Sequence, residues 1–187
     1  MSTTTHAYLT AKTEAMTDKE LVLQALETIK ARIAENIQTK QRMDGRGGIE
    51  ASGRTRKSLV VKSTTTGGVL EGRGYFDSLE RGAGPAPRGT WFYGVIRQWI
   101  VDKGITAAPI PYKRKPSERW QPKYTPEERG LTYLAGCFAT SIINRGTVLH
   151  RMGGRADIYS DIINEEIDNL SEQLAINIEQ RIKDNTI

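Results

Sequence analysis

The proline content of residues 105–124 constrains this chain more than any other feature. A proline inside a helix removes a backbone hydrogen bond and clashes with the preceding turn, so no helix continues through four of them. The prolines of this stretch are Pro109, Pro111, Pro116 and Pro122. The same stretch interleaves lysines and arginines with Tyr112, Trp120 and Tyr124. The sequence therefore predicts an extended, basic, aromatic loop, inserted between two helical segments.

The helix after this loop has a sharply defined start. Thr125 is suited to the N-cap position, Pro126 to the first helical position, and Glu128 completes a capping box. We expect the helix to end at Gly146. Its predicted buried stripe consists of Leu131, Ala135, Phe138 and Ile142.

Two long amphipathic helices are predicted near the chain ends. The first is capped by Thr17 and Glu20 and runs to the glycine cluster between residues 45 and 48. The last follows Asp157 as its predicted cap and carries acidic residues along its first half. Its predicted buried stripe, close to a heptad repeat, consists of Ile163, Ile167, Leu170, Leu174, Ile178 and Ile182.

A small antiparallel sheet is predicted between these helices. Residues 57–62 are followed by threonines, the pair Gly67 and Gly68, and a second apolar run, which is typical of a β-hairpin. Two strands make a poor sheet alone, so further strands are expected from residues 105–124 or from a neighbouring subunit. A further helix is predicted from about Thr90 to Gly104, with Phe92, Ile96, Trp99 and Ile100 on one face.

Together these elements predict the α+β class: long N- and C-terminal amphipathic helices around a small antiparallel sheet, with two further helices and long loops. Residues 1–16 are polar and threonine-rich and are expected to form a flexible arm that is disordered alone or ordered only by a neighbour. Residues 17–187 are expected to form a single domain. A mean hydropathy of -0.50 and 37% hydrophobic residues predict a small core, with stability shared with partner chains.

Charge is distributed unevenly along the chain. Residues 51–123 carry 14 lysines and arginines against 5 acids, whereas residues 124–187 carry 6 against 10. A basic middle and an acidic end favour either pairing between subunits or a polyanionic partner. No signal peptide or run of 18 apolar residues is present, so a soluble protein without membrane contact is expected.

Residues able to support catalysis are few. The histidines are His6, in the predicted arm, and His150, in a predicted loop, and neither has a partner at metal-ligand spacing. Cys137 lies in an apolar helical pattern and is expected to be a buried, inert thiol. The sequence therefore predicts a protein that is not an enzyme, with no cofactor and no metal.

The basic loop is the strongest functional feature. Its candidate contact residues are Lys113, Arg114, Lys115, Arg119, Trp120 and Tyr124. They are expected to dock on acidic groups of a neighbouring subunit, for which the last helix offers Glu165, Glu166 and Asp168. The alternative is contact with nucleic acid, in which the cations bind phosphates and the aromatic rings stack on bases, as in a small basic nucleic-acid-binding protein.

The central block resembles the tail-completion and head-to-tail connector (neck) proteins of tailed bacteriophages. The resemblance rests on a glycine–arginine start to a strand, an aromatic pair, and a leucine–glutamate–x–glycine turn. In this chain these residues are Gly53, Arg54, Arg56, Lys57, Ser58, Leu59, Tyr75, Phe76, Leu79, Glu80 and Gly82. The long helices before and after the block also occur in the expected order. The basic loop, the helix after it and the length of the final helix are additions to the minimal form of the family.

The resemblance implies a structural virion protein that forms a homo-oligomeric ring, six-fold or twelve-fold, in the neck or tail of a virus assembled in the bacterial cytoplasm. Its implied partners are itself, portal, adaptor or tail proteins, and transiently the genomic DNA that passes through the lumen. Tyr75 and Phe76 join the candidate interface residues on this ground. The segment from Gly146 to Gly154 is expected to pack on a neighbouring subunit.

Overall fold

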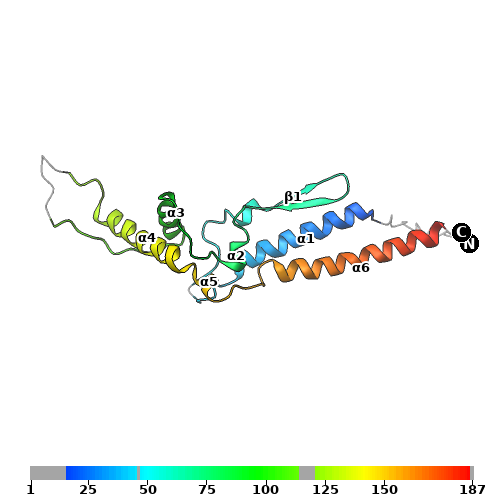
Figure 1. Cartoon of the computed structure of the whole chain (residues 1–187). Helices are drawn as coiled ribbons and strands as arrows, with labels where there is room; N and C mark the ends of the chain where they lie inside the picture. Colours follow the sequence, from blue (N-terminus) through cyan, green and yellow to red (C-terminus); the bar gives the residue numbers. More distant parts are fainter. Residues whose placement is uncertain (1–15, 46, 114–120, 186–187) are drawn as a thin grey trace, which may run out of the picture.

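The computed structural model describes residues 16–45, 47–113 and 121–185. The chain is elongated (Figure 1). In one half, helix α1 (Asp18–Thr39) and helix α6 (Ser160–Asn185) lie side by side, with a β-hairpin along the other side of α1. In the other half lie helices α3 (Trp91–Asp102) and α4 (Pro126–Arg145). We call the first half the body and the second half the lobe.

Helices α1 and α6 run antiparallel, so the start of α1 and the end of α6 lie at the same end of the body. At the other end of the pair, the side-chain amide of Asn36 donates to the backbone carbonyls of Asp157 and Ile158. At the distal end, Asn177 donates to the backbone carbonyl of Met16 and to the carboxylate of Asp18. Polar contacts therefore fix the register of the two helices at both ends.

The N-terminus of α1 is capped as predicted. The Thr17 hydroxyl accepts from the backbone N–H of Glu20, whose carboxylate accepts in return from the backbone N–H of Thr17 at 2.8 Å. This reciprocal pair satisfies N–H groups that have no partner inside the helix. The helix ends at Thr39, earlier than the predicted glycine cluster, because Lys40 adopts an extended conformation and residues 41 and 48 close a short bridge instead.

The hairpin consists of β1 (Val60–Ser63) and β2 (Gly68–Glu71), preceded by a 3-10 turn at Arg56–Ser58. It pairs Val61 with Leu70 and Ser63 with Gly68. One face packs on α1 so closely that a Cβ at Gly68 would lie 2.7 Å from the Leu23 side chain. The predicted hairpin is confirmed, but the described residues of 105–124 add no strand. Helix α1, rather than a third strand, covers the apolar face of the sheet.

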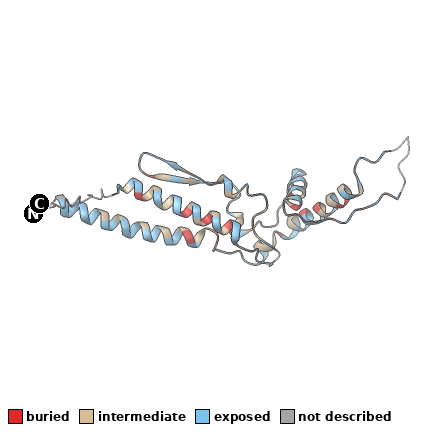
Figure 2. Cartoon of the chain, turned by 180° about the vertical axis from the view of Figure 1, so that it is seen from behind, coloured by how far each residue is buried: buried red, intermediate tan, exposed pale blue. Residues whose placement is uncertain are grey.

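The body has its own apolar core, formed where α1, the hairpin and the start of α6 meet. The buried positions of α1, drawn red in Figure 2, belong to it with the exception of Leu21. Leu26, Leu70, Phe76 and Ile163 surround this core and are only partly buried. Its buried members are Ile29, Ile33, Ile37, Leu59, Ile158 and Ile162.

The lobe has a second, separate core between α3 and α4. The predicted face of α3 is confirmed, since Phe92, Ile96 and Ile100 are buried. They pack on Ala135 and Ala139, whose small side chains let the two helices approach closely. The capping box of Thr125 and Glu128 and the end of α4 before Gly146 also match the prediction.

The face of α4 predicted to be buried is partly wrong. Ala135 is buried, but Phe138 is 37% exposed and contacts the edge of Trp99, with 6.1 Å between ring centroids. Cys137 is exposed rather than buried. Two residues along a helix correspond to about 200° of rotation, so Cys137 points away from the face on which Ala135 and Ala139 lie.

Three contacts join the lobe to the body at the C-terminal end of α3. The Lys103 ammonium donates to the backbone carbonyls of residues 48, 49 and 50, at 2.6 Å to that of Glu50. Burial lowers the pKa of Lys103, and the charge of Arg42 adds to the effect. Arg54 pairs with Asp102 at 2.7 Å, and the Arg42 guanidinium lies 5.7 Å from the centroid of Trp99.

Helix α6 departs from the prediction at its start and along its length. Asp157 does not cap it but pairs with Arg155 and Lys40. The predicted stripe is buried only in part, because Ile167, Ile178 and Ile182 are 51%, 48% and 61% exposed. The face turned toward α1 shares three residues with that stripe but has Glu166 and Asn177 in place of the others, and Figure 2 shows the distal half of α6 largely exposed. Its half-buried positions are Ile163, Glu166, Leu170, Leu174 and Asn177.

Candidate interaction surfaces

The base of the proline loop is held firmly against the first turns of α4. Ile110 donates its backbone N–H to the carbonyl of Pro126 at 2.8 Å. Arg129 donates to the carbonyls of Ile110 and Pro111, and its guanidinium lies 4.0 Å from the ring centroid of Tyr112. The prolines and these bonds together orient the described limbs of the loop, which extend beyond α4 in Figure 1.

The predicted contact residues of the loop are only partly described. Arg114, Lys115, Arg119 and Trp120 lie outside the described residues. Lys113 is exposed, and Tyr124 is 44% exposed with the Lys123 ammonium 5.3 Å from its ring centroid. The Tyr112 hydroxyl donates to the carbonyl of Tyr124 at 3.0 Å and joins the two limbs. The described limbs therefore present cations and aromatic rings at the end of the lobe.

The lobe carries positive charge that the described residues do not neutralise. Most basic side chains earlier in the chain form ion pairs, for example Arg56 with Glu50 at 2.8 Å and Lys62 with Glu71 at 2.6 Å. In contrast, no described carboxylate forms an ion pair with four basic residues of the lobe. Arg129 and Arg145 of α4 likewise form no such pair, and the four outside that helix are Arg88, Arg97, Lys113 and Lys123.

Two of the three predicted acidic partners of the loop are already engaged within the chain. Arg32 of α1 donates to Glu165 and to Glu166, at 2.6 Å each. These hydrogen bonds lower the pKa of Glu165 and raise that of Arg32. Asp168 is exposed, on the side of α6 turned away from α1, as are Asp161 and Glu172. The exposed acidic side of α6 is therefore Asp161, Asp168 and Glu172 rather than the predicted trio.

The predicted aromatic pair divides between surface and interior. Tyr75 is 50% exposed, and its hydroxyl accepts from Arg73 at 2.8 Å. Phe76 is turned inward, half-buried, with its ring centroid 5.3 Å from that of Tyr159. Of the pair, Tyr75 is exposed on the outer surface, whereas Phe76 lines an apolar groove.

Glu80 is a buried polar anchor of the body, a role that the sequence around it does not indicate. It is 3% exposed, and its Oε1 accepts from the backbone N–H groups of Ile158, Tyr159 and Ser160 at 2.9, 2.6 and 2.9 Å. Its other oxygen accepts from the Ser160 hydroxyl. Glu80, in helix α2 (Ser78–Arg81), thus caps α6 from a distant part of the chain.

The turn after Glu80 docks on the segment that contains helix α5 (Val148–Arg151). Ala83 and Thr147 exchange hydrogen bonds of 2.9 and 2.8 Å. Gly82 has a φ of +70°, and a Cβ there would lie 2.5 Å from the backbone nitrogen of His150. The segment from Gly146 to Gly154, predicted to pack on a neighbour, therefore packs on its own chain. No local signal identifies this pairing, because its halves are more than 60 residues apart.

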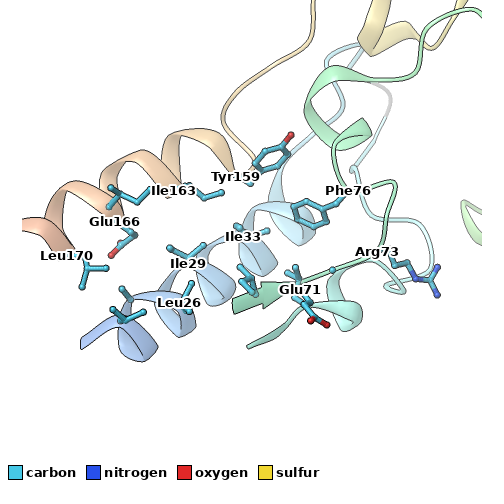
Figure 3. A pocket seen from close by; sticks show the side chains of 16 residues that line it. Leu26, Ile29, Ile33, Glu71, Arg73, Phe76, Tyr159, Ile163, Glu166 and Leu170 are labelled. Carbon is cyan, nitrogen blue, oxygen red and sulfur yellow. The ribbon is translucent and has the colours of Figure 1, made fainter. Parts of the chain in front are cut away.

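An open apolar groove of about 530 Å³ runs along the body between the hairpin and α6, above α1 (Figure 3). Leu26, Ile29 and Ile33 of α1 form its floor, and Ile163, Ile167 and Leu170 of α6 form one wall. The opposite wall is β2 and the residues after it, with Phe76 at one end. In Figure 3 the labelled apolar side chains of α1 and α6, with Phe76 and Tyr159, lie around the space, whereas Glu71 and Arg73 point away from it.

Among the described residues, no group of three or more His, Cys, Asp and Glu side chains is placed to hold a metal ion. None of the described helices combines the length and apolarity needed to cross a membrane. His150 is exposed on α5.

Comparison of the chain with protein-family models, with curated proteins and with solved structures finds no match.

Proposed function

We propose that this chain is a structural virion protein, a ring-forming head-to-tail connector or tail-completion subunit of a tailed bacteriophage. The observation that carries the proposal is the separation of charge along an elongated molecule. The lobe ends in basic and aromatic residues, while the outer side of α6 in the body is acidic. Two complementary surfaces at different places on one chain favour head-to-tail contact between copies, and such contacts form a ring when the rotation between copies closes.

The small cores support a chain that is completed by its neighbours. Among the residues that the structure describes, twelve hydrophobic ones are buried, in two separate clusters and at Leu21. Exposed apolar side chains continue along α6 at Ile176, Ile178 and Ile182. Burial of such residues between subunits stabilises an assembly by about 25 cal/mol for each Å² of apolar surface.

The residues that carry the resemblance to connector proteins have structural roles in this chain. Leu59 is buried in the body core, Phe76 and Leu79 pack against it, and Glu80 caps α6. A motif made of core and capping residues suits a scaffold, whose function lies in its surfaces. We infer that portal, adaptor or tail proteins bind the two ends of the ring, and that its location is the neck or tail of the virion.

The proposal is tested by reversing the charge of the loop. Replacing Lys113, Arg114, Lys115 and Arg119 with glutamate should dissociate the oligomer, as measured by light scattering at fixed protein concentration. A second reversal to lysine at Asp161, Asp168 and Glu172 should partly restore it. The matched control reverses Lys62 and Arg81, which are exposed basic residues of the body, and should leave the oligomer intact.

Nucleic-acid binding is the alternative outcome of the same experiment. If the loop contacts phosphates, each lost cation lowers the slope of log affinity against log salt by about 0.9 while the oligomeric mass stays unchanged. A DNA titration of each variant at two salt concentrations measures this slope. Unchanged oligomers with weakened DNA binding would replace the connector proposal with the nucleic-acid-binding one.

A further inference from the structure

Helix α3 is apolar on the side that faces α4 and also on the side that faces away from it. On this outer side, Trp91, Val95 and Val101 are 65%, 50% and 51% exposed. Gly94 and Gln98 lie between them, because these positions recur at steps of three and four. A helix that is apolar all round is normally buried on all sides, and the described residues leave the outer side of α3 uncovered (Figure 2).

The charge near this outer side is positive. Arg97 lies on its flank, one turn before Val101, and Arg88 lies just before the helix, with its guanidinium 4.8 Å from the ring centroid of Phe92. No described carboxylate forms an ion pair with either arginine. The lone acid of α3, Asp102, lies at its C-terminal end and is paired with Arg54. Tryptophan and arginine are the side chains that most often dominate the energy of a protein interface.

The apolar groove of the body has the opposite properties. It has a volume of about 530 Å³, which is in the range of pockets that bury a ligand, and its α6 wall includes Ile167, a 51% exposed residue (Figure 3). Asp168 follows Ile167 about 100° further round the helix. Asp161 and Glu172 lie on the same side of α6 as Asp168, and no described cation forms an ion pair with these three acids. The groove is therefore an apolar cleft bordered by negative charge.

The groove cannot receive α3 of its own chain. Lys103, directly after α3, is bound to the backbone carbonyls of residues 48, 49 and 50 and fixes that end of the helix beside the body. Trp91 lies at the other end, about 16 Å further along α3. No residue of α3 lines the groove, and Figure 1 shows α3 beside α4 and apart from α6. The α3 helix can therefore enter only the groove of another copy.

We propose that α3 of one copy docks in the apolar groove of the next copy, with Trp91 seated between α1 and α6 and with Arg88 and Arg97 facing the acidic side of α6. A second copy is favoured as the occupant because the two surfaces are complementary in charge as well as in polarity. The contact has an apolar centre and a charged rim, as protein interfaces commonly do. This inference rests on the proposed head-to-tail ring and names the surfaces that form its contact.

The test uses two variants, each of which lacks one half of the contact. Trp91→Asp places a charge on the outer side of α3, and Ile167→Asp places one on the wall of the groove. In light scattering, each variant alone should be monomeric at a protein concentration at which the unmodified chain is oligomeric. An equimolar mixture should form a dimer and nothing larger, because it retains one intact α3 and one intact groove for each pair of chains.

Two results of the mixing experiment would overturn the proposal. Variants that keep the mass of the unmodified oligomer would show that neither surface takes part in the contact. A mixture that remains monomeric would show that each surface pairs with its own copy, as in a symmetric dimer, rather than with the other surface.

Matched controls show whether a new charge on any exposed apolar residue has the same effect. Tyr133, on α4, is 67% exposed, and Val69, on the hairpin, is 48% exposed; neither lies on α3 or lines the groove. Tyr133→Asp and Val69→Asp should leave the oligomeric mass unchanged. Far-UV circular dichroism of all four variants should match that of the unmodified chain, because the replaced side chains are exposed. Dissociation by the two controls as well would overturn the assignment of the contact to α3 and the groove.

A milder variant and a charge exchange measure the contact in the oligomer itself. Trp91→Ala should weaken association at least about 30-fold, the effect of truncating a dominant interface residue. Arg88→Glu combined with Arg97→Glu should also weaken it, and Asp168→Lys with Glu172→Lys in the same chain should partly restore it. Unchanged association of Trp91→Ala, or an absence of restoration, would overturn the proposed placement of α3.

The loop variant of the preceding section separates failure of this contact from failure of the ring. If the loop reversal dissociates the oligomer while Trp91→Asp and Ile167→Asp do not, the ring remains supported and the α3 contact is overturned. If the mixture forms the expected dimer but the unmodified chain grows in mass with concentration without limit, the α3 contact is supported and the closed ring is overturned. An unmodified chain that is monomeric at all concentrations would overturn both.

Discussion

The body and the lobe are both built on a pair of helices, but different interactions stabilise them. In the body, long helices are joined by an ion pair of Arg32 with Glu165 and Glu166 and by asparagine contacts at both ends. In the lobe, α3 and α4 meet through Ala135 and Ala139. The body therefore has directional polar contacts that specify its register, whereas the lobe depends on close apolar packing and on its attachment to residues 48–50.

This comparison predicts an asymmetry in stability. The lobe core has five buried residues on two helices, which is too few for independent folding, so the lobe should require the body. The body has a core, a hairpin and a capped helix of its own. It should remain folded when the lobe is loosened.

The largest effects are expected from cavities in the two cores. Ile33→Ala and Ile100→Ala each remove part of a fully buried side chain and should lower the free energy of unfolding by about 3 to 4 kcal/mol. The tryptophans lie only at positions 91, 99 and 120, so their fluorescence follows the lobe and its loop, while far-UV circular dichroism follows all helices. Ile33→Ala should shift both signals together, and Ile100→Ala should shift fluorescence first. Coincident shifts in both variants would show one cooperative unit.

The next largest effect concerns the capping of α6. Glu80→Ala leaves three backbone N–H groups at the start of the helix without their buried acceptor. It should lower the free energy of unfolding by about 3 kcal/mol. Urea unfolding followed by circular dichroism measures the change. Glu172→Ala, at an exposed position of the same helix, is the control and should stay within about 0.5 kcal/mol. A cost below about 1 kcal/mol for Glu80→Ala would show that solvent or Ser160 replaces the carboxylate.

A smaller effect is expected at the junction between the two regions. Lys103→Ala removes the ammonium that holds three backbone carbonyls and should cost about 2 kcal/mol, with a larger shift in fluorescence than in circular dichroism. Lys62→Ala removes a lysine whose ion pair is exposed and should cost less than about 0.5 kcal/mol. Equal shifts of the two signals in Lys103→Ala would indicate that the lobe is not separately loosened.

The smallest predicted effect is on acid stability at the start of α6. Hydrogen bonds from Arg155, and then from Lys40, hold the pKa of Asp157 well below its ordinary value. A lowered pKa in the folded state gives stability that is present above the unfolded pKa of about 3.9 and lost as the pH falls further. Asp157→Asn should therefore reduce the slope of stability against pH between about pH 4 and pH 2. Lys40→Met should give an intermediate slope. An unchanged slope in both variants would show that Asp157 is not the source of this acid sensitivity.

Local signals in the sequence determined the ends and faces of several elements. The capping boxes at Thr17 and Thr125, the hairpin at Gly67 and Gly68, and the buried face of α3 are confirmed. The α+β class, with helices near both ends of the chain around a small sheet, is confirmed as well. Each of these features depends on residues within about four positions of one another or on a simple periodicity, and such signals do not require a tertiary partner.

Only the tertiary structure decided the features whose partners are distant in the chain. Glu80 could not be recognised as the cap of α6, since 78 to 80 residues separate it from the N–H groups that it binds. The stripe from Ile163 to Ile182 has apolar periodicity along its whole length, but α1 covers a face that shares only three of its residues and leaves Ile167, Ile178 and Ile182 exposed. Periodicity shows that a helix has an apolar side, whereas the position of its neighbour determines which residues are buried. For the same reason Glu165 and Glu166, predicted to bind another subunit, bind Arg32 of their own chain, because antiparallel pairing of α1 and α6 places it beside them.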